Sequence, residues 1–170
     1  MLTAKQIIDC LKLQPNPAEG GLFASTYVSA LQVADIGLPG FAPTPNGRAL
    51  SSAIYYFIEA GNFSAMHKVT GDMIYHFYTG DPVEMLLLHP DGSSEVCTFS
   101  SHTGKGAGPM KIIPGDTWLG SRMKPGGQYA LMGVTMAPGF HPNDYIIGKR
   151  PALIDAYPDR KEMITELTRP

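Results

Sequence analysis

The sequence is poor in cysteine, tryptophan and charge. Its 170 residues include two cysteines and one tryptophan, and charged residues make up 16% of the chain. Cys10 and Cys97 lie far apart and match no spacing typical of a metal site or redox pair, which predicts two reduced thiols. The 13 basic and 15 acidic residues give a net charge of −2. Because nucleic-acid-binding proteins normally carry a basic stripe, we expect no nucleic-acid partner.

Long hydrophobic runs and familiar catalytic motifs are also absent. No apolar stretch approaches the roughly 20 residues that span a membrane, so we expect no membrane partner. The N-terminal residues lack the charged-then-apolar order of a signal peptide. The chain has no G-x-S-x-G nucleophile elbow, no Walker loop and no dinucleotide fingerprint. We therefore expect a cytoplasmic protein that is not a hydrolase of a familiar type.

What the sequence does contain is a series of short apolar runs. Hydrophobic residues make up 44% of the chain, and the 19 glycines and 15 prolines fall largely in turns. The β-branched and aromatic runs cover residues 51–58, 73–78, 83–89, 95–99, 110–113, 117–122 and 128–136. Strands at this spacing predict an all-β sandwich or barrel. We predict a single domain over residues 1–170, with its barrel at about residues 20–147.

The two ends of the chain have a different pattern. Residues 3–13 predict a helix in which Thr3 and Gln6 form a capping box. A first strand is expected at residues 22–29, and the glycine- and proline-rich residues 30–48 predict a long surface loop. The tail, residues 151–170, is expected to form two helical pieces separated at Pro158.

Two stretches have intervals that can be counted. The first reads G-x5-H-x-V-x3-M-x6-G from Gly61 to Gly80, and the second reads G-x5-P-x-D-x2-L-x3-M from Gly108 to Met123. These intervals match the two motifs of the cupin family, so the chain resembles a cupin. The resemblance implies an RmlC-like jelly-roll β-barrel with short N- and C-terminal helices and an active site between the motifs.

The ligand positions of a metal cupin are mostly lost. In metal cupins two histidines, a glutamate and a further histidine bind one ion, and the resemblance retains only His67 of these. The other positions hold Val69, Met73 and Leu119, which have no hard donor atom. The resemblance thus implies a degenerate metal site and no metal cofactor.

A more specific resemblance comes from an ordered series of short motifs. They are EGG at 19–21, SAIYY at 52–56, YHFYTGDP at 75–82, HPDG at 89–92 and PGDTW at 114–118. Over about residues 13–147 the chain is similar to the cupin-5 (DUF985) branch, whose function is uncharacterised and whose members look like homodimers. It departs from the branch at Met73, at Tyr75 and at residues 24–25, where the branch has glutamate, tryptophan and an Arg-Glu pair. These departures indicate either a different ligand or weaker binding.

Two residues are candidates for catalysis. The first cupin motif implies that His67 faces into the barrel, where it could act as a base, as in related epimerases; a hydrogen-bonded core histidine is the alternative. If Met73 faces inward, strand alternation turns Tyr75 and Phe77 inward and His76 outward. Tyr75 is then a candidate acid, with simple packing as its alternative.

Six further residues are candidates for binding a ligand. Adjacent positions on a strand face opposite sides, so only one of Tyr55 and its neighbour can face the pocket. Arg122 could bind a carboxylate or phosphate, or could simply be solvated. The predicted binding residues are Val69, Met73, Phe77, Leu119, Tyr55 and Arg122.

Three functions remain open at this stage. The first is a metal-independent cupin that binds a small organic or sugar-like ligand. The second is an epimerase or isomerase of a sugar or sugar-nucleotide, with His67 as base and a barrel tyrosine as acid. The third is a structural homodimer whose pocket is vestigial.

Overall fold

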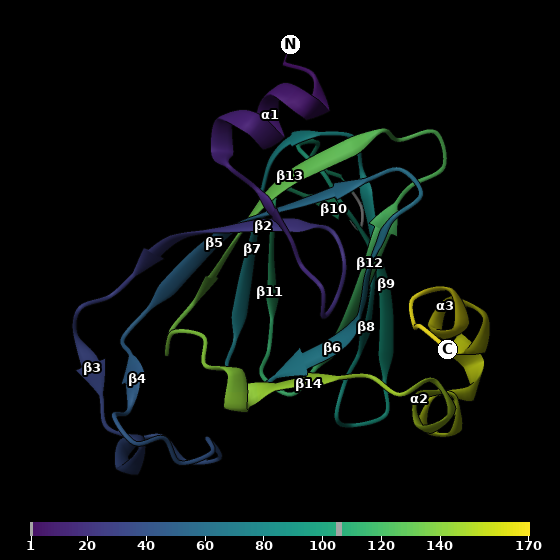
Figure 1. The fold of residues 1–170 in the computed structure, drawn as a ribbon. Helices are drawn as coiled ribbons and strands as arrows, with labels where there is room; N and C mark the ends of the chain where they lie inside the picture. The colour runs from purple at the N-terminus through teal and green to yellow at the C-terminus, as the bar shows by residue number, and fades with distance from the viewer. Residues whose placement is uncertain (1, 105–106) are drawn as a thin grey trace.

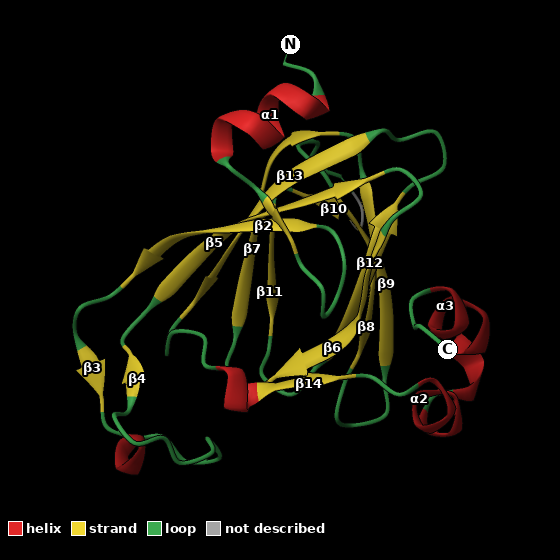
Figure 2. Ribbon diagram, viewed as in Figure 1, coloured by secondary structure: helices red, strands yellow, loops and turns green. Residues whose placement is uncertain are grey.

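Two antiparallel-strand sheets form the body of the protein, which we describe from a computed structural model. The structure describes residues 2–104 and 107–170. Each main sheet has six strands, and the sheets face one another as the two walls of a flattened barrel (Figure 1). The helices lie at the periphery of these walls (Figure 2). The predicted all-β jelly-roll class is confirmed.

The order of strands in the two walls brings distant parts of the chain together. The first sheet runs in the order β1 (Gln14–Pro15), β2 (Leu22–Val28), β5 (Ser52–Glu59), β13 (Tyr129–Met136), β7 (Met73–Gly80) and β11 (Met110–Ile113). The second runs in the order β10 (Ala107–Gly108), β9 (Ser94–Phe99), β8 (Val83–Leu88), β12 (Trp118–Met123), β6 (Phe63–Val69) and β14 (Tyr145–Ile147). Within the described residues, only β10 and β9 pair in parallel.

Side-chain alternation along β7 follows the prediction. Met73, Tyr75 and Phe77 are buried, whereas Ile74 and His76 are only half-buried on the opposite face. This period of two is the geometry of a pleated strand with one face against the core. The inward side chains of β7 join those of β8, β12 and β13 in one apolar core between the sheets.

The N-terminal helix α1 (Ala4–Leu11) has the predicted capping box. The Gln6 amide N–H donates to the Thr3 hydroxyl oxygen, and the Gln6 side chain accepts from the Thr3 amide N–H. The helix ends two residues earlier than expected, because Lys12 adopts a left-handed conformation with φ of 53°. Ile7 packs against the outer face of the first sheet.

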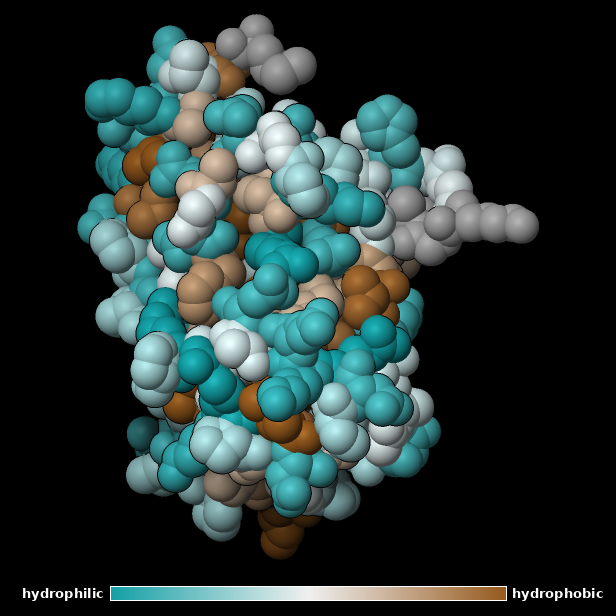
Figure 3. Space-filling view, turned by 90° about the vertical axis from the view of Figure 1, so that its right-hand side faces the viewer, coloured by the Kyte–Doolittle hydropathy of each residue, from teal (hydrophilic) through white to brown (hydrophobic). Residues whose placement is uncertain are grey.

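The C-terminal tail covers the outer face of the second sheet. Its helices are α2 (Arg150–Ala156) and α3 (Lys161–Glu166), joined by the 3-10 turn η3 (Pro158–Arg160), which confirms the predicted break at Pro158. Leu153 and Leu167 pack against Met66 of β6. The surface on this side is mostly hydrophilic, with isolated hydrophobic residues (Figure 3). Among the described residues no helix has the length and apolar character that crossing a membrane requires.

Residues 30–48 are more ordered than a simple surface loop. They contain β3 (Gln32–Val33) and the 3-10 turn η1 (Asp35–Gly37), and β3 pairs with β4 (Arg48–Ala49). Arg48 is only 1% exposed. Residues 30–47 are exposed or half-buried, as predicted for a surface segment, but the segment ends in a buried charge that is bound to distant residues.

Candidate functional site

A cavity of about 510 Å³ opens between the inner faces of the two sheets. Most of its wall is apolar and comes from β2, β5, β6, β7 and β13. The apolar residues include Phe23, Ile54, Val69, Met73, Val134 and Met136. Glu19, His67 and three tyrosines add polar groups to this wall. An apolar cavity of this size with a few polar groups is the usual form of a small-molecule site.

Glu19 and His67 form a buried pair at the cavity. The His67 Nδ1 atom lies 2.8 Å from the Ala65 carbonyl oxygen, and Nε2 lies 3.1 Å from Glu19 Oε2. Since a carbonyl can only accept, Nδ1 carries a proton. The contact between Nε2 and the carboxylate is then a hydrogen bond only if a second proton lies on one of these two atoms. The geometry therefore couples the His67 ring directly to the Glu19 carboxylate.

A tight turn before β2 places the Glu19 carboxylate. The Asn16 side-chain amide donates to Glu19 Oε1 at 2.7 Å, and its own oxygen accepts from the Ala18 and Glu19 amides. Gly20 has φ of +98°, and a Cβ atom there would lie 2.4 Å from the Phe63 carbonyl oxygen. The turn can approach β6 this closely only because Gly20 has no side chain. This contact explains why glycine follows Glu19 in the sequence.

Three tyrosines, Tyr56, Tyr75 and Tyr145, line the cavity near this pair; we call them the cavity tyrosines. Burial and then the negative charge of Glu19 raise the pKa of each phenol. All three hydroxyls therefore stay protonated near neutral pH and can donate hydrogen bonds. The Tyr56 hydroxyl donates to the Gly20 carbonyl at 2.8 Å.

Tyr145 differs from Tyr56 in its hydrogen bonding. Its ring stacks on that of His67, with ring centres 5.4 Å apart. Its hydroxyl is sealed from solvent and makes no hydrogen bond of good geometry among the described residues, although the Glu19 carboxylate lies near enough to raise its pKa. Buried hydroxyls without a partner are rare and are often found at functional sites.

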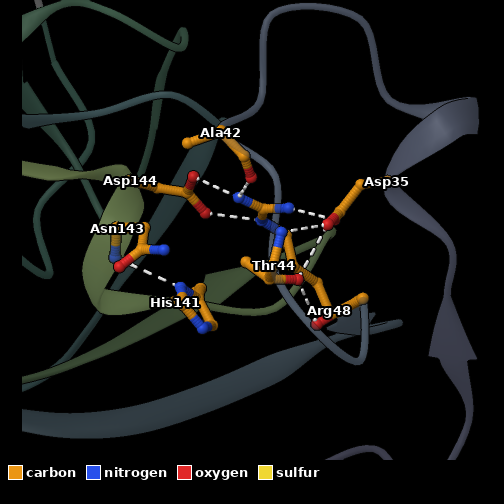
Figure 4. A network of polar contacts seen from close by, with 8 residues as sticks. Asp35, Ala42, Thr44, Arg48, His141, Asn143 and Asp144 are labelled. Carbon is orange, nitrogen blue, oxygen red and sulfur yellow. Dashed lines mark hydrogen bonds and ion pairs between the residues drawn. The ribbon is translucent and has the colours of Figure 1, made fainter.

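A buried arginine holds the segment that carries Tyr145. Arg48 donates to both carboxylate oxygens of Asp144, at 2.7 and 2.6 Å, and also pairs with Asp35 (Figure 4). Asp35 in turn accepts from the Thr44 amide and hydroxyl. Asp144 ends the 3-10 turn η2 (Pro142–Asp144), directly before Tyr145. Residues 35–48 thereby fix one edge of the cavity.

The structure brings together four of the eight residues that the sequence nominated. His67, Val69, Met73 and Tyr75 all line the cavity. Phe77 and Leu119 are buried in the core beside it and are not part of its wall. Their inward direction is as predicted, but their side chains do not border the cavity.

Two nominated residues lie elsewhere, which corrects the prediction. Tyr55 points to the outer face of β5, where its ring meets that of Tyr78 edge-on at 5.9 Å; its neighbour Tyr56 faces the cavity instead. Arg122 also points outward and binds Glu84 and Glu166. An arginine with two carboxylate partners is already satisfied, so Arg122 offers no free charge to an anion in the cavity.

The residues around His67 do not fit the metal site of a cupin. At the remaining ligand positions, Val69 and Met73 give the cavity apolar side chains, and Leu119 lies opposite His67 in the pairing of β12 with β6. Glu19 is the one carboxylate paired with His67 in the described residues, which contain no group of three or more His, Cys, Asp or Glu suited to a metal ion. Two donors fall short of the three or four protein ligands that such an ion needs.

Comparison with known proteins agrees with this architecture. A family model described as cupin superfamily (DUF985) matches residues 5–147. A protein of known structure from Shewanella oneidensis is 28% identical, with a TM-score of 0.85 over 100% of this chain and 99% of that chain. A hypothetical protein from Leishmania major is 22% identical, with a TM-score of 0.83 over 99% of this chain and 100% of that chain. No curated protein matches the sequence.

A more distant structure shares the fold alone. A cupin 2 conserved barrel domain protein from Rhodopseudomonas palustris is 11% identical, with a TM-score of 0.56 over 100% of this chain and 87% of that chain. The family match covers most of the chain, including both walls of the barrel and the cavity between them. The chain belongs to the DUF985 family of the cupin superfamily.

Proposed function

We propose that the protein binds a small organic molecule in the barrel cavity without the help of a metal ion. The observation that carries this proposal is the cavity itself, because about 510 Å³ of apolar space adjoins the buried Glu19–His67 pair. A vestigial pocket would be filled by its own side chains, and this one is open. The apolar wall supplies affinity, and the polar groups orient the ligand.

A cavity-filling substitution tests the proposal. Val134 lies on the inner face of β13 and lines the cavity, so Val134→Phe places a ring in the ligand's space. The matched control is Val96→Phe on β9, where the side chain is 39% exposed. Native mass spectrometry should find a small molecule retained by the wild type and by Val96→Phe but not by Val134→Phe. Equal retention by all three proteins would place the ligand outside the cavity.

The isomerase reading is a second candidate and has its own support. His67 and Tyr75 line the same cavity, and no hydrogen bond of the Tyr75 hydroxyl is found within the described residues. A base and a neutral phenol facing one space can remove and return a proton at a carbon centre. No lysine or arginine belongs to the part of the wall that the structure describes, so a nucleotide diphosphate would lack a counter-charge there. The candidate is therefore restricted to uncharged sugars and similar carbon acids.

Isotope exchange separates this candidate from simple binding. An isomerase exchanges a carbon-bound proton of its substrate with D₂O, and His67→Ala abolishes that exchange. We screen uncharged sugars by NMR for such exchange with the wild type and with His67→Ala. The homodimer expected from the family resemblance is tested by light scattering of the same preparations, where the mass of a single chain would contradict it.

A further inference from the structure

The cavity has an unusual balance of charge and aromatic surface. Among the described residues, its wall includes one carboxylate, Glu19, and neither lysine nor arginine. Five aromatic side chains contribute to the same wall: Phe23, Tyr56, Tyr75, Phe140 and Tyr145. Arg169, from the C-terminal tail, lies outside the wall: it donates to the Ala18 carbonyl and covers the Phe63 ring. Its positive charge opposes the rise in the pKa of Tyr145 without cancelling it.

This balance favours a positively charged group over a negative one. Aromatic faces carry partial negative charge, and an ammonium within about 6 Å of a ring centre is attracted to it. A carboxylate accepts hydrogen bonds from an ammonium and repels another carboxylate. The cavity tyrosines add no positive charge. An anion would therefore enter a buried space with little to compensate it, which is costly.

We propose that the ligand is an organic amine whose ammonium group binds at Glu19 among the aromatic rings. The inference rests on the proposed function, since it assigns a ligand class to the same cavity. The hydrocarbon part of the amine lies along the apolar wall that Ile54, Val134 and Met136 provide. Glu19 thus becomes the residue that determines specificity, and His67 its partner in the unliganded protein.

Charge balance within the site is consistent with this assignment. In the unliganded protein the Glu19 carboxylate faces His67 Nε2 at 3.1 Å. The ammonium supplies a further hydrogen-bond donor, of opposite charge, to the same carboxylate. His67 keeps its Nδ1 proton on the Ala65 carbonyl. The other titratable groups of the wall are the cavity tyrosines, which stay neutral.

Three probes of similar shape test the assignment: 2-phenylethylamine, 2-phenylethanol and phenylacetate. We measure their binding by isothermal titration calorimetry to the wild type, to Glu19→Gln and to Glu166→Gln. The last variant is the matched control, because it makes the same change at a carboxylate on the outer surface that pairs with Arg122. Circular dichroism and urea unfolding check that each variant is folded.

The expected result is a preference for the amine that depends on Glu19. The wild type and Glu166→Gln should bind 2-phenylethylamine at least about tenfold more tightly than 2-phenylethanol, and phenylacetate most weakly. Glu19→Gln should bind the amine and the alcohol about equally. The wild-type ratio alone tests the inference if Glu19→Gln fails to fold.

Two outcomes would overturn the inference in distinguishable ways. If the alcohol binds as tightly as the amine, or phenylacetate binds best, the ligand class is wrong and the binding function stands. If none of the three probes binds, then even the uncharged 2-phenylethanol finds no site in the cavity. That result counts against both the ligand class and the proposed function.

Discussion

Removing the hydroxyl of Tyr145 should stabilise the ligand-free protein. This hydroxyl is buried, and the nearby Glu19 carboxylate does not form a hydrogen bond of good geometry with it. A buried polar group without a partner costs about 1–3 kcal/mol in desolvation. Tyr145→Phe leaves the ring in its stack with His67 and removes that cost, so the free energy of unfolding should rise by about 1 kcal/mol or more.

The same substitution at Tyr56 should lower the free energy of unfolding instead of raising it. The Tyr56 hydroxyl donates to the Gly20 carbonyl at 2.8 Å. Tyr56→Phe loses this bond, worth about 1 kcal/mol, and leaves a buried carbonyl with one donor fewer. The two variants should therefore differ by about 2 kcal/mol or more, although they delete the same atom from residues of the same cavity.

Urea unfolding followed by the fluorescence of Trp118, the single tryptophan, measures the difference. With a slope of about 2 kcal/mol per molar urea, a change of 1 kcal/mol moves the midpoint by about 0.5 M. Tyr78→Phe is the control, because Tyr78 is 52% exposed on the outer face and should shift little. If Tyr145→Phe lowers the midpoint as far as Tyr56→Phe does, the Tyr145 hydroxyl has a partner and this account of the site fails.

Three further predictions follow from the site and its supports. Arg48→Met should lower the free energy of unfolding by about 3–5 kcal/mol, because it leaves the buried Asp144 carboxylate without its charged partner. Arg122→Met, at a partly exposed pair, should cost about 1 kcal/mol or less, and equal costs of the two substitutions would contradict this account. Gly20→Ala should cost more than Gly61→Ala in the same urea assay, because both have positive φ but only at Gly20 does a Cβ collide with the Phe63 carbonyl; equal costs would contradict the close approach. The cavity tyrosines should ionise only as the protein unfolds, since burial raises their pKa in the folded state. Their stabilising contribution is thus present below about pH 10 and lost above it, and absorbance at 295 nm should show three late-titrating phenols that coincide with loss of the folded circular dichroism.

The sequence predicts the strand faces well because alternation is a local property. Met73, Tyr75 and Phe77 face inward as expected from a pleated strand. The same rule shows why the prediction for Arg122 is wrong: Leu119 is buried at the core, so Arg122, an odd number of residues further along β12, faces out. Alternation alone does not decide which of Tyr55 and Tyr56 faces the cavity. That choice also depends on which side of β5 meets the core.

The parts of the site that the sequence missed depend on contacts between distant segments. Glu19 looks like the start of a glycine turn, and its pairing with His67 comes from the docking of that turn on β6. Arg48 lies at the end of a glycine- and proline-rich stretch, and its partner Asp144 is 96 residues further along the chain. No local pattern signals either contact. The sequence offers one cue to the role of Glu19. It is a carboxylate directly before two glycines, in a chain that also has a histidine at the first cupin motif.

The central claim is that the cavity binds a small organic ligand without a metal. Native mass spectrometry of protein purified without chelators, combined with elemental analysis, tests it most directly. The account predicts a retained organic mass that the Val134→Phe variant lacks, and a metal content far below one ion per chain. About one tightly held metal ion per chain, removed together with the ligand by a chelator, would contradict the account.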